Sequence, residues 1–76
     1  MRVTTESGTV YDFSLDGALV RRIGGAPLRK DGEWMRVVDC SDITLGQPMR
    51  MMLDGVGEKV LTARVTTPVV KVIGRV

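Results

Sequence analysis

The chain has 76 residues, of which 43% are hydrophobic and 26% are charged, and its formal net charge is +2. This length allows one small domain, and the balance of apolar and charged residues excludes a disordered tail. The sequence contains no run of 18 apolar residues and no signal-peptide pattern at its start. We therefore expect a single domain, residues 1–76, with no membrane association, that acts in a cytoplasm.

Glycine next to a polar residue divides the chain into short segments. Such pairs occur at Ser7-Gly8, Asp16-Gly17, Asp31-Gly32 and Asp54-Gly55. Glycine adopts the positive φ that tight turns require, and Asp and Ser form hydrogen bonds to their own backbone there. The segments between the pairs are rich in Val, Thr and Ile, which is typical of strands. The expected strands are residues 2–6, 9–15, 18–23, 33–39, 48–54, 59–66 and 69–73.

The connections follow from the same residues. We expect a hairpin around Ser7-Gly8 and a second turn over residues 15–18, which together form a three-stranded meander. Residues 40–47 make a longer connection, in which Ser41 would cap a single helical turn. Pro68 cannot donate a backbone hydrogen bond, so it is expected to divide the last run into two strand pieces.

No segment shows the apolar spacing of a long helix. Six or seven short strands can protect their edges by closing on one another. The expected fold is therefore all-β: a small antiparallel barrel or sandwich, SH3-like or OB-like in size.

Alternate residues of a strand lie on the same face of a sheet. In the methionine-rich stretch P-M-R-M-M-L, residues 48–53, this rule places Met49, Met51 and Leu53 in the core. Methionine fills irregular gaps, which suits a small barrel with few aromatic residues. Arg50 and Met52 should point outward.

The same rule sorts the other segments. Tyr11, Phe13 and Leu15 are expected to share one face, and Met35 and Val37 another, opposite Trp34 and Arg36. In the segment 59–66, the apolar face is expected to consist of Leu61, Ala63 and Val65, opposite Arg64. In the segment 69–73, Val70 and Val72 are expected on one face, opposite Val69, Lys71 and Ile73. The tripeptide V-T-T occurs at 3–5 and again at 65–67, which we interpret as shared strand composition.

The residue types exclude much chemistry. The chain has no histidine and one cysteine, so it cannot form a Ser-His-Asp or Cys-His site, and a zinc site is not expected. It has no phosphate-binding glycine motif, and its carboxylates are scattered singly. We expect no enzymatic activity, no metal and no cofactor. Cys40 is expected to be a half-buried, unreactive core residue.

The leading interpretation is a binding protein. Trp34, Arg36, Arg50 and Met52 are expected on the outer face of neighbouring strands, and Trp and Arg are the types enriched at interfaces. Apolar residues on both faces of the sheet favour association, either as a homo-oligomer or with another protein. For Trp34 taken by itself, a position as a cap over one end of the barrel is favoured, because a lone Trp is usually the largest core residue of a small domain, and an exposed interface anchor is the alternative.

Nucleic-acid binding is the second interpretation. A basic stripe on the outer face could track phosphates, with Trp34 stacking on a base. The low net charge and Asp12, Glu33 and Asp39 argue against it. A ligand pocket in the mouth of the barrel and a structural role in a virion are further alternatives. The stripe would consist of Arg21, Arg22, Arg36, Arg50, Arg64 and Lys71.

The order of several short motifs resembles that in short all-β accessory proteins of actinobacterial phages, especially mycobacteriophages. The motifs are V-T-T-E-S-G-T-V-Y (3–11), R-R-I (21–23), D-G-E-W (31–34), S-D-I-T-L-G-Q-P (41–48) and V-T-T-P-V-V (65–70). The resemblance implies a phage protein that acts in the host cytoplasm, binds a host protein and modulates a host process. It transfers no functional residues.

Overall fold

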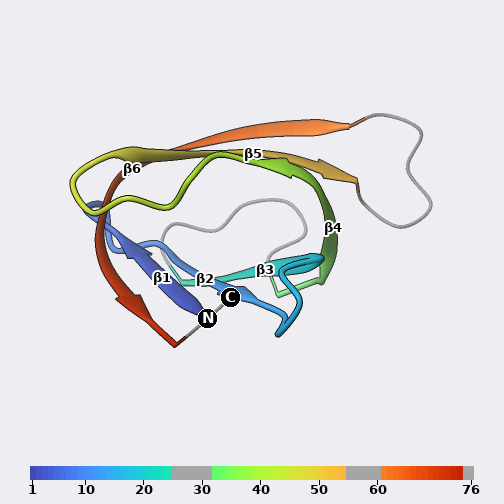
Figure 1. Ribbon diagram of the computed structural model, residues 1–76, viewed down its shortest axis with the longest axis horizontal. Coiled ribbons are helices and arrows are strands. Elements are labelled where there is room, and N and C mark those ends of the chain that lie inside the picture. The colour runs from blue at the N-terminus through green and yellow to red at the C-terminus, as the bar shows by residue number, and fades with distance from the viewer. Residues whose placement is uncertain (25–31, 55–60, 75–76) are drawn as a thin grey trace.

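The computed structural model describes residues 1–24, 32–54 and 61–74, which form six antiparallel strands (Figure 1). Each strand pairs with the next one in the chain, and the last pairs with the first, so the sheet closes into a barrel. The prediction of a small all-β antiparallel barrel is confirmed. The strands are β1 (Arg2–Thr5), β2 (Val10–Phe13), β3 (Leu19–Gly24), β4 (Met35–Cys40), β5 (Pro48–Asp54) and β6 (Thr62–Ile73).

The first three strands form the expected meander. In the β1–β2 turn, Gly8 has a φ of 86° and its N–H donates to the carbonyl of Thr5 at 2.9 Å. In the β2–β3 turn, the N–H of Gly17 donates to the carbonyl of Ser14 at 2.9 Å. This turn begins directly after Phe13, so Leu15 is 90% exposed. The prediction that Leu15 shares a face with the buried Tyr11 and Phe13 is wrong.

The last strand is continuous. β6 runs through Pro68, so the expected division into two pieces is wrong; residues 59–60 of that prediction lie outside the described residues. The pairing of β6 slips once against β5 and once against β1. At the first slip, the N–H of Met49 donates to the Thr66 hydroxyl at 3.0 Å. These bulges bend the strand and allow a proline within it.

The bulges also change which residues of β6 face the interior. Between Val69 and Val65 the extra residue reverses the alternation, so Val69 is 1% exposed and Val65 is 66% exposed. Arg64 pairs with the buried Met51 and lies on the inner face with it. The predictions of an inward Val65, an outward Arg64 and an outward Val69 are therefore wrong, because a shift of one residue exchanges the two faces of a strand.

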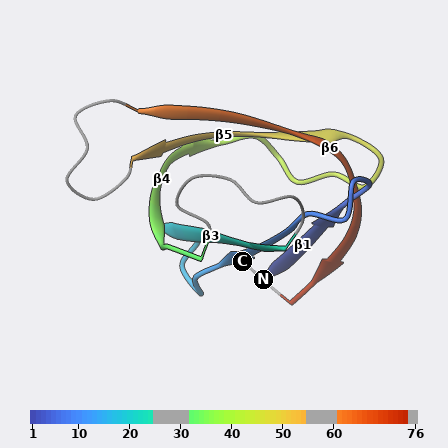
Figure 2. The same ribbon diagram turned by 180° about the vertical axis from the view of Figure 1, so that it is seen from behind.

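Figures 1 and 2 show β5 and the first half of β6 as a paired arm, from which β6 bends down to meet β1. The core lies between this arm and β1–β3, and the prediction that Met49, Met51 and Leu53 fill it is confirmed. The described part of the chain has no helix long and apolar enough to cross a membrane. The buried apolar residues are Val3, Tyr11, Phe13, Val20, Met35, Met49, Met51, Leu53 and Val69.

Residues 41–47 do not form the expected helical turn. The N–H of Ser41 donates to the carbonyl of Arg50 at 2.9 Å, and the N–H of Arg50 donates to the Ser41 hydroxyl at 3.0 Å. Ser41 therefore extends the contact between β4 and β5 and does not cap a helix. Leu45 then forms an isolated bridge with Val69, which fastens the connection to β6.

Candidate functional site

An apolar surface lies on the outside of the barrel across β4, β5 and β6. We call it the β4–β6 outer face and define it by Val38, Arg50, Met52, Ala63 and Val65. In the strand register, Met52 stands opposite Ala63, and Arg50 stands opposite Val65. Residues directly opposite each other share a face of the sheet. The half-buried Met52 is therefore flanked by exposed residues, of which Val65 is 66% and Val38 is 50% exposed.

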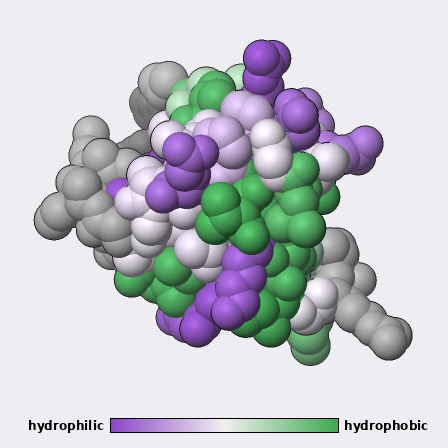
Figure 3. All heavy atoms as spheres, turned by 90° about the vertical axis from the view of Figure 1, so that its left-hand side faces the viewer, coloured by the Kyte–Doolittle hydropathy of each residue, from purple (hydrophilic) through white to green (hydrophobic). Residues whose placement is uncertain are grey.

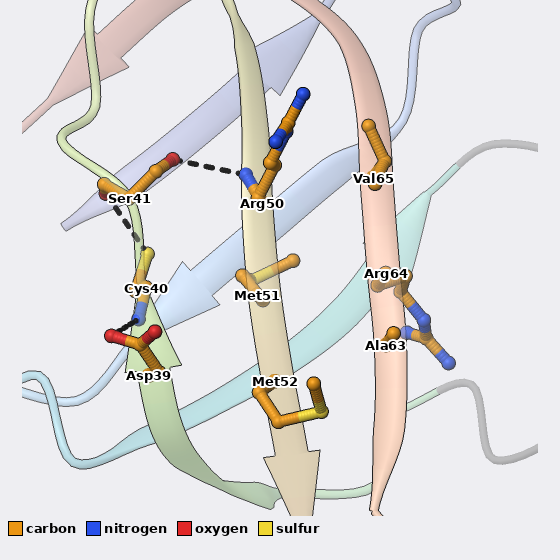
Figure 4. Close-up of a pocket in the computed structure, with 9 residues that line it drawn as sticks. All are labelled: Asp39, Cys40, Ser41, Arg50, Met51, Met52, Ala63, Arg64 and Val65. Atoms are coloured by element: carbon orange, nitrogen blue, oxygen red, sulfur yellow. Dashed lines mark hydrogen bonds between the residues drawn. The ribbon is translucent and has the colours of Figure 1, made fainter.

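The outer face is hollowed at its centre. A cavity of about 340 Å³ is lined by residues 39–41 of β4 and its continuation, 50–52 of β5 and 63–65 of β6 (Figure 4). Figure 4 shows the Arg50 side chain extending along one side of it and Met52 lying farther along the same strand. The alternation predicted for residues 48–53 thus places Arg50 and Met52 together, as expected from the sequence.

Two opposite charges belong to this surface. Arg50 lies on β5, and Asp39 lies on β4 directly opposite Met52, which makes the two charges diagonal neighbours. Within the described residues, neither forms an ion pair. Asp39 accepts only a local hydrogen bond from the N–H of Cys40 at 3.0 Å. Both charges therefore remain available to a partner.

Trp34 and Arg36 have other neighbours. Trp34 is 41% exposed just before β4, and the guanidinium of Arg21 lies 4.7 Å from its ring centroid. Trp34 therefore packs under a cation on the outside of the barrel and does not enclose one end. Arg36 forms an ion pair with Asp54, its cross-strand partner on β5. The four predicted contact residues thus divide into Arg50 with Met52, Arg36 with Asp54, and Trp34 with Arg21.

The predicted basic residues do not form one stripe on the outside. Arg22 is 5% exposed, and Arg64 faces the interior. Arg21 and Arg36 are each within ion-pair distance of a carboxylate. Lys71 is exposed on the second half of β6, where that strand pairs with β1. A nucleic-acid backbone would meet separate, partly neutralised charges instead of a continuous basic surface.

Asp12 links two of these arginines across β1, β2 and β3. Its carboxylate accepts hydrogen bonds from Arg2 at 2.8 and 3.1 Å and lies 3.6 Å from Arg21. The hydrogen bond from Arg2 is the main cause that lowers the pKa of Asp12 below its ordinary value. A carboxyl group whose pKa is lower in the folded than in the unfolded protein stabilises the fold at pH values above its unfolded-state pKa, which is near 4. This stabilisation is lost as the pH falls through the folded-state pKa.

We expect Asp12→Asn to lower the free energy of unfolding at pH 7 by about 0.5 kcal/mol, a small effect because Arg2 is half exposed. The difference from the unmodified protein should shrink as the pH falls below 4, because protonated Asp12 no longer attracts Arg2. Urea denaturation at pH 7 and at pH 3 measures both values. A difference that is the same at both pH values would contradict this role for Asp12.

Cys40 is half-buried and packs against the core, as expected. Burial is the largest cause that raises the pKa of its thiol, followed by the charges of Asp39 and Asp42. The thiol therefore stays protonated near neutral pH, which makes it a poor nucleophile. Among the described residues, no group of three His, Cys, Asp or Glu side chains could hold a metal ion.

No protein-family model, no curated protein and no solved structure matches this chain. Its own surfaces are therefore the basis for assigning a function. The sequence predicted the β5 part of the outer face and missed the β6 part, because Val65 and Ala63 were expected inside. No local signal marks the bulge that turns them outward.

Proposed function

We propose that the protein is a non-enzymatic binding module that acts by protein–protein contact through the β4–β6 outer face. The observation that carries this proposal is an apolar centre on the outside of a closed barrel, formed by the exposed Val38 and Val65 around the half-buried Met52. A barrel buries its apolar side chains inside, so an apolar area on its outside favours a contact with another molecule.

The apolar area continues along the second half of β6. Leu45, Val70 and Ile73 are 63%, 54% and 51% exposed. Figure 3 shows hydrophobic side chains gathered on the side of the molecule where β6 bends toward β1, with polar side chains around them. A partner that covers β5 and β6 would thus meet apolar surface beyond the central hollow.

The partner that fits the centre of this face is a second copy of the chain. A two-fold interface joins the same surface of both copies, so each surface must complement itself. Arg50 and Asp39 meet this condition, because they are adjacent, opposite in charge and not paired with each other. An axis between them would place Arg50 of each copy against the partner's Asp39. The resemblance to phage accessory proteins suggests that the dimer in turn binds a host protein and modulates its process.

Charge exchange tests this arrangement. We expect Arg50→Asp and Asp39→Arg each to weaken self-association by roughly tenfold or more, because each places like charges together at the interface. The double variant should recover much of the loss, since it restores opposite charges in exchanged positions. Sedimentation velocity over a concentration series gives the dissociation constant for each protein.

Asp42→Arg is the matched control, because Asp42 is exposed in the connection after β4 and is not part of the outer face. It makes the same change of charge as Asp39→Arg and should leave the dissociation constant unchanged. A protein that stays monomeric at all concentrations would rule out the second copy as partner. Single variants that associate like the unmodified protein would rule out this pair of residues.

A further inference from the structure

A pocket of about 330 Å³ opens at one end of the barrel. Neighbouring strands run in opposite directions, so β1 begins at the end of the barrel where β2, β4 and β6 finish. Met1 precedes β1, and Phe13, Cys40 and Val72 are the last or next-to-last residues of β2, β4 and β6. We therefore call this hollow the mouth pocket. It is lined by Met1, Phe13, Gly17, Cys40, Ser41, Asp42, Ile43 and Val72.

The apolar walls of the mouth pocket are continuous with the core. Phe13 belongs to the core itself, and Met1, Cys40 and Ile43 pack against it. Val72 stands opposite the fully buried Val3 in the ladder between β1 and β6 but is itself 37% exposed. Side chains that continue the core thus reach solvent at the mouth. An apolar molecule seated there would extend the core and remove this surface from water.

The polar groups of the walls already have partners within the protein. The Cys40 thiol donates to the carbonyl of Ser41 at 3.3 Å. The Ser41 hydroxyl donates to the carbonyl of Asp42 at 3.4 Å and accepts from the N–H of Arg50 at 3.0 Å. A polar ligand would have to displace these hydrogen bonds and would gain little by replacing them. What the pocket offers to a ligand is therefore its apolar surface.

The charges near the pocket favour neither sign of ion. The carboxylate of Asp42 is exposed, and among the described residues it forms no ion pair. The amine of Met1, which carries the opposite charge, donates to the carbonyl of Phe13 at 3.3 Å. A charged ligand would lose water against apolar walls without meeting a buried group of opposite charge. The pocket therefore favours a neutral molecule.

We propose that the mouth pocket binds a small neutral apolar molecule, aromatic or aliphatic. Its volume falls within the roughly 300–1,000 Å³ of clefts that hold small molecules, which are mostly apolar and are found at the mouths of β-barrels. A barrel of about eight strands can hold a ligand inside, but this one has six and its interior is filled by the core. The ligand therefore sits at the mouth, against Phe13 and Val72.

A series of three ligands of similar size tests the proposal. At pH 7, benzyl alcohol is neutral, benzylamine is a cation and benzoate is an anion. Benzyl alcohol should shift the amide NMR signals of Gly17, Ile43 and Val72 saturably, with a dissociation constant of roughly millimolar, as expected for so few heavy atoms. Benzylamine and benzoate should bind roughly tenfold more weakly or worse, because each must lose its hydration.

Cyclohexylmethanol distinguishes the two sources of an apolar ligand, because it is the aliphatic counterpart of benzyl alcohol. Tighter binding of benzyl alcohol would assign the pocket to aromatic molecules, for which the ring of Phe13 provides a stacking partner. Equal or tighter binding of cyclohexylmethanol would assign it to aliphatic ones. Either result supports a neutral apolar ligand.

Val72→Phe places a larger side chain at the wall of the pocket and should weaken binding of benzyl alcohol by roughly tenfold, because it occupies the space of the ligand. Val70→Phe is the matched control, since it makes the same exchange at an exposed position of the same strand outside the pocket. It should bind benzyl alcohol normally. Ile43→Ala is a second variant, which removes part of the wall and should weaken binding several-fold. Circular dichroism establishes that each variant is folded.

Cys40 and Ser41 also line the hollow on the β4–β6 outer face, so the titration is read at Gly17, Ile43 and Val72, which line only the mouth pocket of these two. The proposal is overturned if neither alcohol shifts these signals saturably, or if the shifts are confined to residues 50–52 and 63–65. It is also overturned if a charged analogue binds as tightly as benzyl alcohol, or if Val72→Phe and Ile43→Ala both keep the affinity of the unmodified protein. A loss in Val70→Phe equal to that in Val72→Phe would count against it as well. None of these results bears on self-association, which is measured without ligand.

Discussion

Met49→Ala is expected to lower the free energy of unfolding by about 2–5 kcal/mol. Met49 is fully buried in the core, at 0% exposed. Replacing it removes apolar contacts and leaves a cavity that the surrounding strands can only partly close. A domain of 76 residues has a total stability of roughly 4–11 kcal/mol at typical values per residue, so this single change should remove a large share of the total stability.

Met52→Ala is the matched control, because it makes the same substitution on the same strand at a half-buried position of the outer face. Its cost should stay below about 1 kcal/mol. Urea denaturation of both variants, followed by tryptophan fluorescence from Trp34, gives the two values. Equal losses would show that the inner and outer positions of β5 do not differ in burial, contrary to the structure.

These two methionines also show why β5 could be predicted from the sequence. Met49, Met51 and Leu53 alternate with Arg50 and Met52 over five residues, and no bulge interrupts that alternation between Arg50 and Leu53. The first three strands were predictable for a related reason. Their turns contain Ser7-Gly8 and Asp16-Gly17, which are local signals that do not depend on the rest of the fold.

β6 could not be predicted in the same way. Its faces depend on two bulges, and one of them is stabilised by a hydrogen bond from Met49 to Thr66, which are 17 residues apart. Such a contact is not visible in the local pattern of hydrophobic residues. Pro68 was expected to break the strand, but it lies in β6 directly beside the slip in the pairing with β5, and its register partner there is another proline, Pro48.

A polar pocket lined by Arg22, Arg64 and several hydroxyl groups was missed for a different reason. Arg64 was placed on the outside because it lies between Ala63 and Val65, which were expected inside, and Arg22 was counted in the outer basic stripe. One signal was present in the sequence, namely the repeated V-T-T at 3–5 and 65–67. Thr5 from the first copy and Thr66 and Thr67 from the second line the same pocket. Two threonine-rich segments on strands that pair with each other would therefore have been a reason to expect a polar cluster.

Val65→Glu is expected to abolish self-association at concentrations where the unmodified protein is dimeric. Val65 lies opposite Arg50 near the centre of the outer face and is 66% exposed. In the monomer, the new carboxylate would stay in water at little cost. In the dimer it would stand directly opposite Arg50 and compete for that cation with the partner's Asp39, which would leave one carboxylate buried without a cation at a cost of several kcal/mol. The fold and its unfolding temperature should therefore change little while the dimer is lost.

Leu15→Glu provides the comparison, because Leu15 is 90% exposed in the β2–β3 turn and lies outside the outer face. It makes a similar exchange of an exposed apolar side chain for a carboxylate and should leave the dimer intact. Light scattering coupled to size-exclusion chromatography gives the molar mass of each variant, and thermal unfolding reports its fold. Loss of the dimer in both variants would point to net charge as the cause. Loss in Val65→Glu alone, with unchanged thermal stability, would assign association to β5 and β6, where apolar side chains on the outside of the barrel lie next to Arg50 and Asp39.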